Sequence, residues 1–235
     1  MATVGFDTAT DDTSVAAVRG GEIVYESLLG LSEKGGPQHA TALLAEIERA
    51  ANACGGWEAV SSLAVGVGPG SFTGLRVGIA TARGIGLSRG LPVAGVCSLD
   101  AVGRALGERS EAESSLAVLD ARRGEVFAAL YSNGGERLWE PAVHAPEELA
   151  ARIAQLADAP LGGGAGAVKF RAELAKRGVE IPDDTDPVHR IAARHICFLA
   201  ASGGSDDEAE PAIPIYLRPP DAERWRERDS FPTAK

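Results

Sequence analysis

At 235 residues and 45% hydrophobic content, the chain can bury one large core or two smaller ones, and we expect two lobes of about 100 residues each. Its net charge of −10 argues against tight binding of RNA or DNA by this chain alone, because neutralising phosphates requires a basic face. No stretch reaches the roughly 18 apolar residues of a membrane span, and the first residues lack the features of a signal peptide, so we expect a cytoplasmic protein without membrane contact.

The first 30 residues predict a strand followed by a hairpin. They read TVGFDTAT and then TSVAAVRGGEIVYESLL, in which two apolar runs flank a turn at Gly20–Gly21. From His39 to Cys54, apolar residues recur at the spacing of an amphipathic helix, and Gly55–Gly56 provide its C-terminal stop. This mixture of strands and helix is typical of an α/β protein.

A glycine-rich turn, GVGPGSFTGLR, follows the short apolar strand SLAVGV and leads into a helix from Gly74 to Arg89. The turn lacks the GxxxxGK[ST] pattern of a Walker loop, and it does not complete the GxGxxG dinucleotide pattern. We favour a turn set by its Pro-Gly pair, with Ser71 or Thr73 as the helix N-cap, while a phosphate at the helix N-terminus stays open as the alternative. Another strand, LPVAGV, follows the helix.

The glycines inside this helix need an explanation, because each costs about 0.5–1 kcal/mol relative to alanine in a helix interior. A row of small residues lets another backbone approach closely. Two interpretations stay open: close packing against the sheet of the same lobe, or a groove for a second helix from another subunit. The row consists of Gly74, Gly78, Ala82, Gly86 and Gly90, at successive four-residue steps.

The segment from Leu116 to Pro141 repeats the order of elements of the opening. Each has an apolar strand ending in Asp, a polar turn, an apolar strand, a Gly-Gly turn and a third strand. We therefore expect two similar lobes, an N-terminal lobe of residues 1–97 and a C-terminal lobe of residues 98–218, followed by a polar tail at 219–235. Further helices are predicted in APEELAARIAQLA, in AVKFRAELAKRG after a glycine turn, and in HRIAARHICFLAASGG, with SDDEAEP as a solvated loop.

Two strand-end aspartates raise the question of nucleotide binding. In the actin-like ATPase architecture, one Asp-bearing hairpin in each lobe reaches toward the nucleotide phosphates and their metal, and the glycines of LGGGAG fall where that architecture contacts adenosine. The alternative is that strand-end Asp and Thr side chains satisfy the backbone of their turns. The candidate site for ATP or ADP with Mg²⁺ comprises Asp7, Thr8, Thr10, Asp120, Gly163 and Gly164.

Sequence motifs for a metal site or a catalytic nucleophile are missing. The histidines form no HxxxH or HExxH pair, and Ser71 lies in GPGSF rather than in GxSxG. The three cysteines stand at wide spacings without a CxxC pair, which is typical of small buried residues in a reducing compartment. We therefore expect neither metal ligands nor catalytic residues in this chain.

Four stretches together resemble the family of bacterial tRNA threonylcarbamoyladenosine biosynthesis proteins called TsaB. They are FDTATDDTSVA, VGVGPGSFTGLRVGIATARGIGLSRGLPVAGVCSLDAV, LDARRGEVFAALY and PIYLRP, and they cover residues 1–131 well and the rest loosely. The resemblance implies an actin-like ATPase (ASKHA) fold with two similar lobes, each a mixed sheet with helices. It also implies a role in transferring a threonylcarbamoyl group from threonylcarbamoyl-AMP to the adenosine next to the tRNA anticodon.

In that family the chemistry belongs to a paralogous enzyme, TsaD, which carries a metal-binding histidine pair written NHLEGH. The matching stretch here is CSLDAV, so Ser98 and Val102 stand where the two histidines would be. Serine is a poor metal ligand and valine is none. The resemblance therefore implies a non-catalytic partner, a pseudo-enzyme subunit that scaffolds or regulates TsaD.

The resemblance further implies a set of partners. They are a TsaD-like catalytic subunit, a TsaE-like ATPase, and a second copy of the chain when it is alone, with tRNA contacted only through the complex. The association is expected to use the two helices of the N-terminal lobe, through His39, Leu43, Ile47, Gly74, Gly78, Ala82 and Gly86.

Two functions from other classes stay open at this point. One is an actin-like, ATP-dependent phosphotransferase or nucleotide-binding protein that uses Asp7 and Asp120. The other, a metalloprotease, would need the metal site that the sequence lacks.

Overall fold

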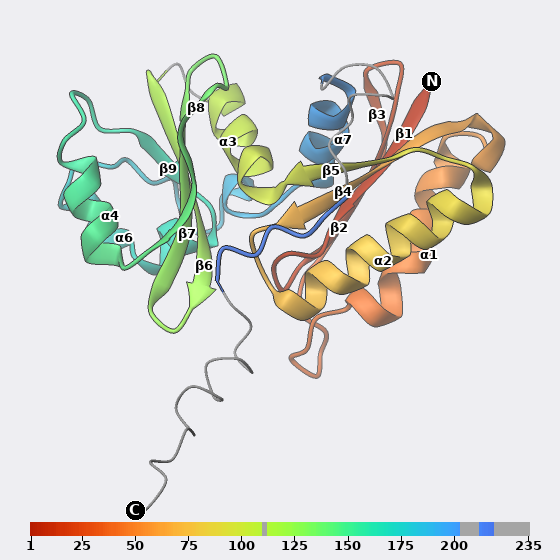
Figure 1. Ribbon diagram of the computed structural model, residues 1–235, viewed down its shortest axis with the longest axis horizontal. Coiled ribbons are helices and arrows are strands. Elements are labelled where there is room, and N and C mark those ends of the chain that lie inside the picture. The colour runs from red at the N-terminus through yellow and green to blue at the C-terminus, as the bar shows by residue number, and fades with distance from the viewer. Residues whose placement is uncertain (110–111, 203–211, 219–235) are drawn as a thin grey trace, which may run out of the picture.

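The computed structural model describes residues 1–109, 112–202 and 212–218, which form two mixed β-sheets covered by helices (Figure 1). The first sheet has five strands in the order β3-β2-β1-β4-β5, and the second has four in the order β8-β7-β6-β9. In each, a three-stranded antiparallel meander is joined by a parallel strand on the far side of its first strand. The expected repeat of two similar lobes is confirmed.

The first sheet forms because its strands are short apolar runs separated by turn residues. Gly20 and Gly21 both have positive φ, at 61° and 87°, which suits the tight turn between the second and third strands. The inner strands are apolar on both sides because helices cover both faces of the sheet. The strands are β1 (Ala2–Asp7), β2 (Thr13–Arg19), β3 (Glu22–Leu29), β4 (Val60–Gly68) and β5 (Val93–Cys97).

Three helices cover this sheet. On one face, α1 (His39–Ala53) packs on β2 and β3, and α2 (Phe72–Arg89) packs on β4 (Figure 1). On the other face, α7 (Ala193–Ser202) packs on β1 and β2. The alternation along β2 shows the two faces directly, since Val15 and Ala17 join the core under α1 while Ala16 and Val18 contact α7.

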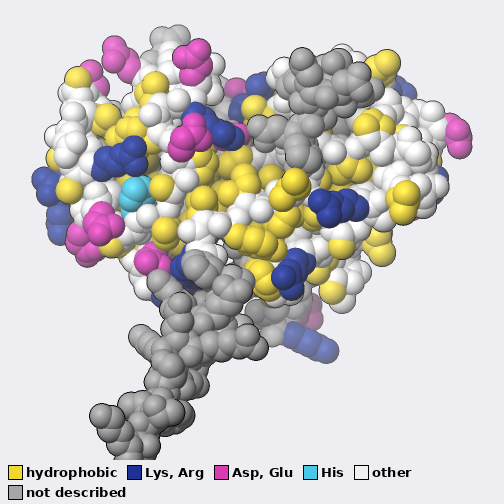
Figure 2. Space-filling model, viewed as in Figure 1, with side chains coloured by type: hydrophobic (Ala, Val, Ile, Leu, Met, Phe, Trp, Pro, Cys, Tyr) yellow, Lys and Arg dark blue, Asp and Glu magenta, His cyan; other side chains and the backbone are white. Residues whose placement is uncertain are grey.

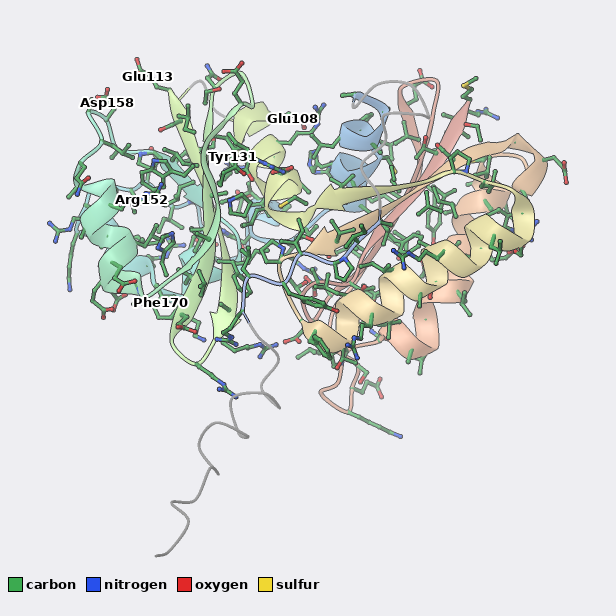
Figure 3. The ribbon with its side chains drawn as sticks, in the orientation of Figure 1. Glu108, Glu113, Tyr131, Arg152, Asp158 and Phe170 are labelled. Atoms are coloured by element: carbon green, nitrogen blue, oxygen red, sulfur yellow. The ribbon has the colours of Figure 1, made fainter. Side chains whose placement is uncertain are left out.

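The second sheet is covered in the same way. On one face, α3 (Ser98–Arg109) is held by Tyr131 of β7, whose hydroxyl donates a 2.7 Å hydrogen bond to Asp100 (Figure 3). Its strands are β6 (Ser114–Arg122), β7 (Glu125–Ser132), β8 (Arg137–His144) and β9 (Leu161–Gly163). The helices of its other face are α4 (Pro146–Ile153), α5 (Ala165–Lys169) and α6 (Arg171–Ala175). The described residues also form two 3₁₀ turns, η1 (Trp57–Ala59) and η2 (Pro187–His189).

The structure divides the chain differently from the expected boundary at residue 98. Although α7 falls within residues 98–218, it packs on the first sheet, because the chain crosses back after η2. Residues 212–218 contact both lobes, with Ile215 N donating to Val67 O at 2.8 Å and Arg218 donating to Ala121 O at 2.8 Å. The short strand β9 and the helix α3 were not among the expected elements. The predicted loop SDDEAEP and the predicted tail at 219–235 lie outside the described residues.

Two smaller findings concern the chain as a whole. Cys54, Cys97 and Cys197 are buried and unpaired, which confirms their interpretation as small core residues. Within the described ranges, no helix combines the length and the apolar character needed to cross a bilayer.

Candidate functional site

A cleft of about 630 Å³ lies between the two lobes. The β1–β2 turn and the turn before α2 line one side, while the β6–β7 turn and η2 line the other. Residues 215–218 close it from the C-terminal side of the described chain. The predicted nucleotide site should lie in this cleft, so each predicted residue can be compared with the residues that line it.

Asp7 does not reach the cleft. Its side chain is 1% exposed, and its two oxygens accept hydrogen bonds from Ser98 Oγ at 2.6 Å and from Ala9 N at 2.7 Å. Burial raises the pKa of this carboxyl, and the two hydrogen bonds offset part of that effect. The carboxylate fills the space beside Gly66, where a Cβ atom would overlap it. Asp7 therefore links β1, β4 and the start of α3.

Thr8 and the predicted adenosine glycines are buried as well. Thr8 Oγ1 donates to Gly74 O at 2.8 Å, so this hydroxyl already has its partner. A Cβ atom on Gly163 would lie 2.8 Å from the side chain of Leu106, and one on Gly164 would lie 2.2 Å from Val118 O. These glycines allow β9 and the following turn to approach α3 and β6 closely, and they do not line the cleft.

Of the predicted nucleotide residues, Thr10 and Asp120 line the cleft. Both oxygens of Asp120 accept hydrogen bonds from Lys169 Nζ, at 3.0 and 2.9 Å. The predicted set is therefore not assembled in one place, since Asp7, Thr8, Gly163 and Gly164 lie outside the cleft. The physical reason is that the side chains of Asp7 and Thr8 point into the lobe, where they form hydrogen bonds with Ser98 and with the Gly74 carbonyl of α2. Nucleotide binding by this chain stays a prediction.

The carboxylates that line the cleft are neutralised by cations. Arg122 Nη2 contacts both oxygens of Asp11 at 2.7 and 2.8 Å, which joins the two lobes across the cleft. Arg190 makes a two-pronged contact with Asp12 at 2.7 and 2.6 Å. With Asp120 paired to Lys169, no unpaired lining carboxylate is left among the described residues to hold a metal ion.

The resemblance places the metal-binding histidines of the catalytic paralogue at the positions of Ser98 and Val102. Ser98 and Val102 are both fully buried, and the Ser98 hydroxyl is committed to Asp7. Within the described ranges, no group of three or more His, Cys, Asp or Glu side chains could hold a metal ion. These residues do not fit the metal that the resemblance assigns to the catalytic paralogue.

The glycine row of α2 faces its own lobe. A Cβ atom on Gly74 would lie 2.0 Å from Thr8 O, one on Gly78 would lie 2.4 Å from Thr8 Oγ1, and one on Gly86 would lie 2.5 Å from Val93 Cγ2. Ala82 is fully buried in the same row, and Gly90 ends the helix with a φ of 66°. Ser71 is the N-cap, with its Oγ accepting from Gly74 N at 3.3 Å. The interpretation as a groove for an external helix is wrong, and close packing on β1, β4 and β5 is the explanation.

The predicted interface residues of α1 are buried too. Leu43 and Ile47 are each 1% exposed and belong to the core. His39 has Nδ1 2.8 Å from Thr13 Oγ1 and Nε2 3.0 Å from Thr10 O. Since a carbonyl only accepts, Nε2 carries the hydrogen and Nδ1 accepts from the threonine hydroxyl. Burial lowers the pKa of His39. These residues do not face a partner, because the apolar face of each helix covers its own sheet.

The outward sides of α1 and α2 expose residues that were not among the predicted interface residues. Leu44 on α1 is 65% exposed and Leu87 on α2 is 89% exposed. Gly84 faces open space, because nothing lies within 4 Å of a Cβ atom built on it. Figure 2 shows hydrophobic and Lys/Arg side chains over α2, with no Asp or Glu among them. In the sequence, the signal for a binding surface of this kind is a leucine on the side of an amphipathic helix that faces solvent.

Three comparisons place the chain among known proteins. The sequence model of the TsaD family, tRNA N6-adenosine threonylcarbamoyltransferase, matches residues 32–188. An uncharacterized protein of Mycobacterium tuberculosis is 36% identical over 90% of this chain and 91% of its own length. The Escherichia coli tRNA threonylcarbamoyladenosine biosynthesis protein TsaB is 33% identical over 68% of this chain and 71% of its own.

Solved structures agree with the sequence comparison. YeaZ from Pseudomonas aeruginosa superposes with a TM-score of 0.76 and 26% identity, covering 92% of this chain and 99% of that one. The ROK hexokinase of Thermus thermophilus gives a TM-score of 0.50 at 15% identity over 87% of this chain and 100% of its own, which shows the fold alone. The expected actin-like ATPase fold is confirmed, and the chain belongs to the family of the TsaD model and, within it, to the TsaB/YeaZ-like proteins.

Proposed function

We propose that this chain is a non-catalytic subunit in the synthesis of threonylcarbamoyladenosine next to the tRNA anticodon. In this proposal it scaffolds or activates a TsaD-like catalytic subunit, a TsaE-like ATPase joins the same assembly, and tRNA is contacted through the assembly in the cytoplasm. Relatives named TsaB support the process. The chain needs no cofactor of its own, and any nucleotide belongs to the assembled complex.

One observation carries the non-catalytic part of the proposal. By the resemblance, Ser98 stands at the first metal-binding position of the catalytic paralogue, and its hydroxyl donates a hydrogen bond to the buried Asp7. Val102 stands at the second position by the same resemblance, is buried and has no atom that could bind a metal. The cleft adds no free carboxylate among the described residues, since Asp11, Asp12 and Asp120 are each paired with a cation. These pairings support a binding role for the chain rather than a chemical one.

The surface that would bind the catalytic subunit is the outward side of α1 and α2. Leu44 and Leu87 expose large apolar side chains there, and a partner that covered them would remove this apolar area from water, which is favourable. Gly84 weakens α2 by about 0.5–1 kcal/mol and has no internal neighbour to justify it. A partner that approaches the helix closely at Gly84 would supply that reason. The same surface would pair two copies when the chain is alone.

Reconstitution tests the function. Modification of tRNA by the TsaD-like and TsaE-like proteins of the same organism should require this chain, and equal activity without it would refute the proposal. Gly84→Leu should abolish co-purification with the TsaD-like subunit while leaving the thermal melting temperature within a few degrees of wild type. Gly84→Ala is the matched control, since it adds a small side chain at the same position and should keep association.

The phosphotransferase alternative is not proposed. It requires Asp7 and Asp120 around one nucleotide, and the first is buried in its lobe while the second lines the cleft.

A further inference from the structure

The two lobes meet directly through α3 and α7, which pack against each other with Arg104 of α3 5.2 Å from the ring of Phe198 of α7 (Figure 1). The cleft lies elsewhere, at the carboxyl ends of β1 and β6. There Asp11 and Arg122 reach across it, but both side chains are exposed, and an exposed ion pair contributes little. Lobes joined in this way are expected to move relative to each other unless a further contact fixes the cleft.

Residues 212–218 provide such a contact beside the cleft. In Figure 1 this segment runs from the first sheet toward the end of β6. Ile215 N donates to Val67 O of β4 at 2.8 Å. Arg83 of α2 donates to Ala212 O at 2.7 Å, and Ala212 is 5% exposed. The first part of the segment therefore belongs to the first lobe.

The end of the segment is held by the second lobe through one side chain. Arg218 donates to Ala121 O at 2.8 Å and to Glu125 Oε2 at 2.6 Å. Its side chain is 15% exposed and that of Glu125 is 35% exposed, so this charge-assisted contact is better shielded from water than the pair across the cleft. Ala121 and Glu125 flank the turn between β6 and β7, so one arginine binds both sides of that turn.

The turn that Arg218 binds has an unusual backbone. Arg122 and Arg123 have φ values of 64° and 56°, in the left-handed region that favours glycine, and Gly124 follows with 81°. Residues other than glycine stay in this region when the surrounding contacts determine their conformation. Asp120 Oδ1, which accepts from Arg122 N at 2.9 Å, is one such contact, and the two hydrogen bonds from Arg218 are others.

We propose that residues 212–218 act as an interlobe clamp, in which Arg218 is the latch that fixes the opening of the cleft. The clamp is bound to the first lobe through Ala212 and Ile215 and to the second lobe at the β6–β7 turn. Releasing the latch leaves the lobes joined through α3 and α7, about which they can swing apart at the cleft. The inference concerns this chain alone and does not rest on the proposed function.

Distance measurements between spin labels on the full chain test the clamp. Ala40→Cys in α1 and Ala172→Cys in α6 place the labels at exposed positions of different lobes, while the native cysteines are buried. Dilution with unlabelled chain removes distances between copies. Arg218→Gln and Glu125→Gln should each broaden the distribution of interlobe distances and shift it to longer values. In both variants, hydrogen exchange of the Ile215 amide should speed up about five- to tenfold.

Arg177→Gln is the matched control, because it removes an exposed arginine of the second lobe away from the clamp and should keep the wild-type distribution. Arg122→Gln removes the exposed pair with Asp11 but leaves the clamp, so it should shift the distances less than Arg218→Gln does. Far-UV circular dichroism verifies that each variant is folded.

Wild-type distances and wild-type exchange of the Ile215 amide in both Arg218→Gln and Glu125→Gln overturn the inference. A shift by Arg122→Gln or Arg177→Gln as large as that by Arg218→Gln also overturns it, because the opening of the cleft would then not depend on the latch. No partner takes part in these measurements, so either result leaves the proposed function standing.

Discussion

The carboxylate of Asp7 and the hydroxyl of Ser98 form a fully buried 2.6 Å hydrogen bond across 91 positions of sequence. The contact joins the end of β1 to the first residue of α3, and thus the first sheet to the helix that covers the second. Both residues were of functional interest in the sequence, as a phosphate-contacting aspartate and as the replacement of a metal-binding histidine. In this structure the two residues are hydrogen-bonded to each other, so the pair stabilises the fold.

This pairing predicts a cost for Ser98→Ala. The variant leaves one oxygen of a buried carboxyl without its partner, which should lower the free energy of unfolding by about 1–3 kcal/mol. Urea unfolding followed by circular dichroism measures it. Ser88→Ala on the exposed side of α2 is the control and should change stability by less than about 0.5 kcal/mol. Equal effects of the two variants would contradict the structural role.

The glycines of α2 predict effects of opposite sign. Gly78→Ala places a Cβ atom 2.4 Å from Thr8 Oγ1 and should destabilise the protein by about 1–3 kcal/mol through overpacking. Gly84→Ala meets nothing within 4 Å and should stabilise it by about 0.5–1 kcal/mol, because alanine is the better helix former. Thermal unfolding of the two variants distinguishes them, and a stabilising Gly78→Ala would show that the row does not pack as described.

Two buried histidines predict a loss of stability in acid. Burial is the main cause that lowers the pKa of His195 to about 4, with Arg194 and Arg104 adding to it, and burial also lowers the pKa of His39. Because the unfolded chain takes up these protons first, the stabilisation is complete above a pH of about 6.5 and is lost as the pH falls toward about 4. Denaturant unfolding between pH 7.5 and 4.5 measures this decline.

His195→Leu separates the two contributions. Among the described residues, neither ring nitrogen of His195 has a hydrogen-bond partner, and a Glu108 carboxylate oxygen lies 3.7 Å from Nδ1. Replacing the ring with an apolar side chain should therefore flatten the decline with pH without loss at pH 7.5. A decline as steep as that of wild type would mean that His195 does not carry the pH dependence.

The two ion pairs of the cleft predict unequal costs. The Asp11–Arg122 pair is exposed, with side chains 42% and 62% accessible, so Asp11→Asn should cost less than about 1 kcal/mol and lose its effect in high salt. The Asp12–Arg190 pair is more buried and two-pronged, so Asp12→Asn should cost more. Urea unfolding at low and high salt compares them, and the reverse order would contradict the geometry.

Local features of the chain were readable from the sequence. The periodicity between His39 and Cys54 predicted α1, observed at His39–Ala53. Ser71 or Thr73 was expected as the N-cap of α2, and Ser71 is the one observed. The repeat of hairpin and Gly-Gly turn predicted the two matching sheets. These features depend on neighbours in sequence, since helix spacing, caps and tight turns involve contacts over only a few residues.

Only the tertiary structure decided which segment packs against each helix face and each strand end. Helix spacing placed Gly74, Gly78 and Gly86 on one face of α2, but only the fold shows that β1 and β5 approach that face. In the same way, the sequence made Asp7 a strand-end carboxylate, and its partner Ser98 comes from another lobe's helix. A pattern of residues determines a face by local geometry, whereas what lies against the face is set by packing among segments far apart in the chain.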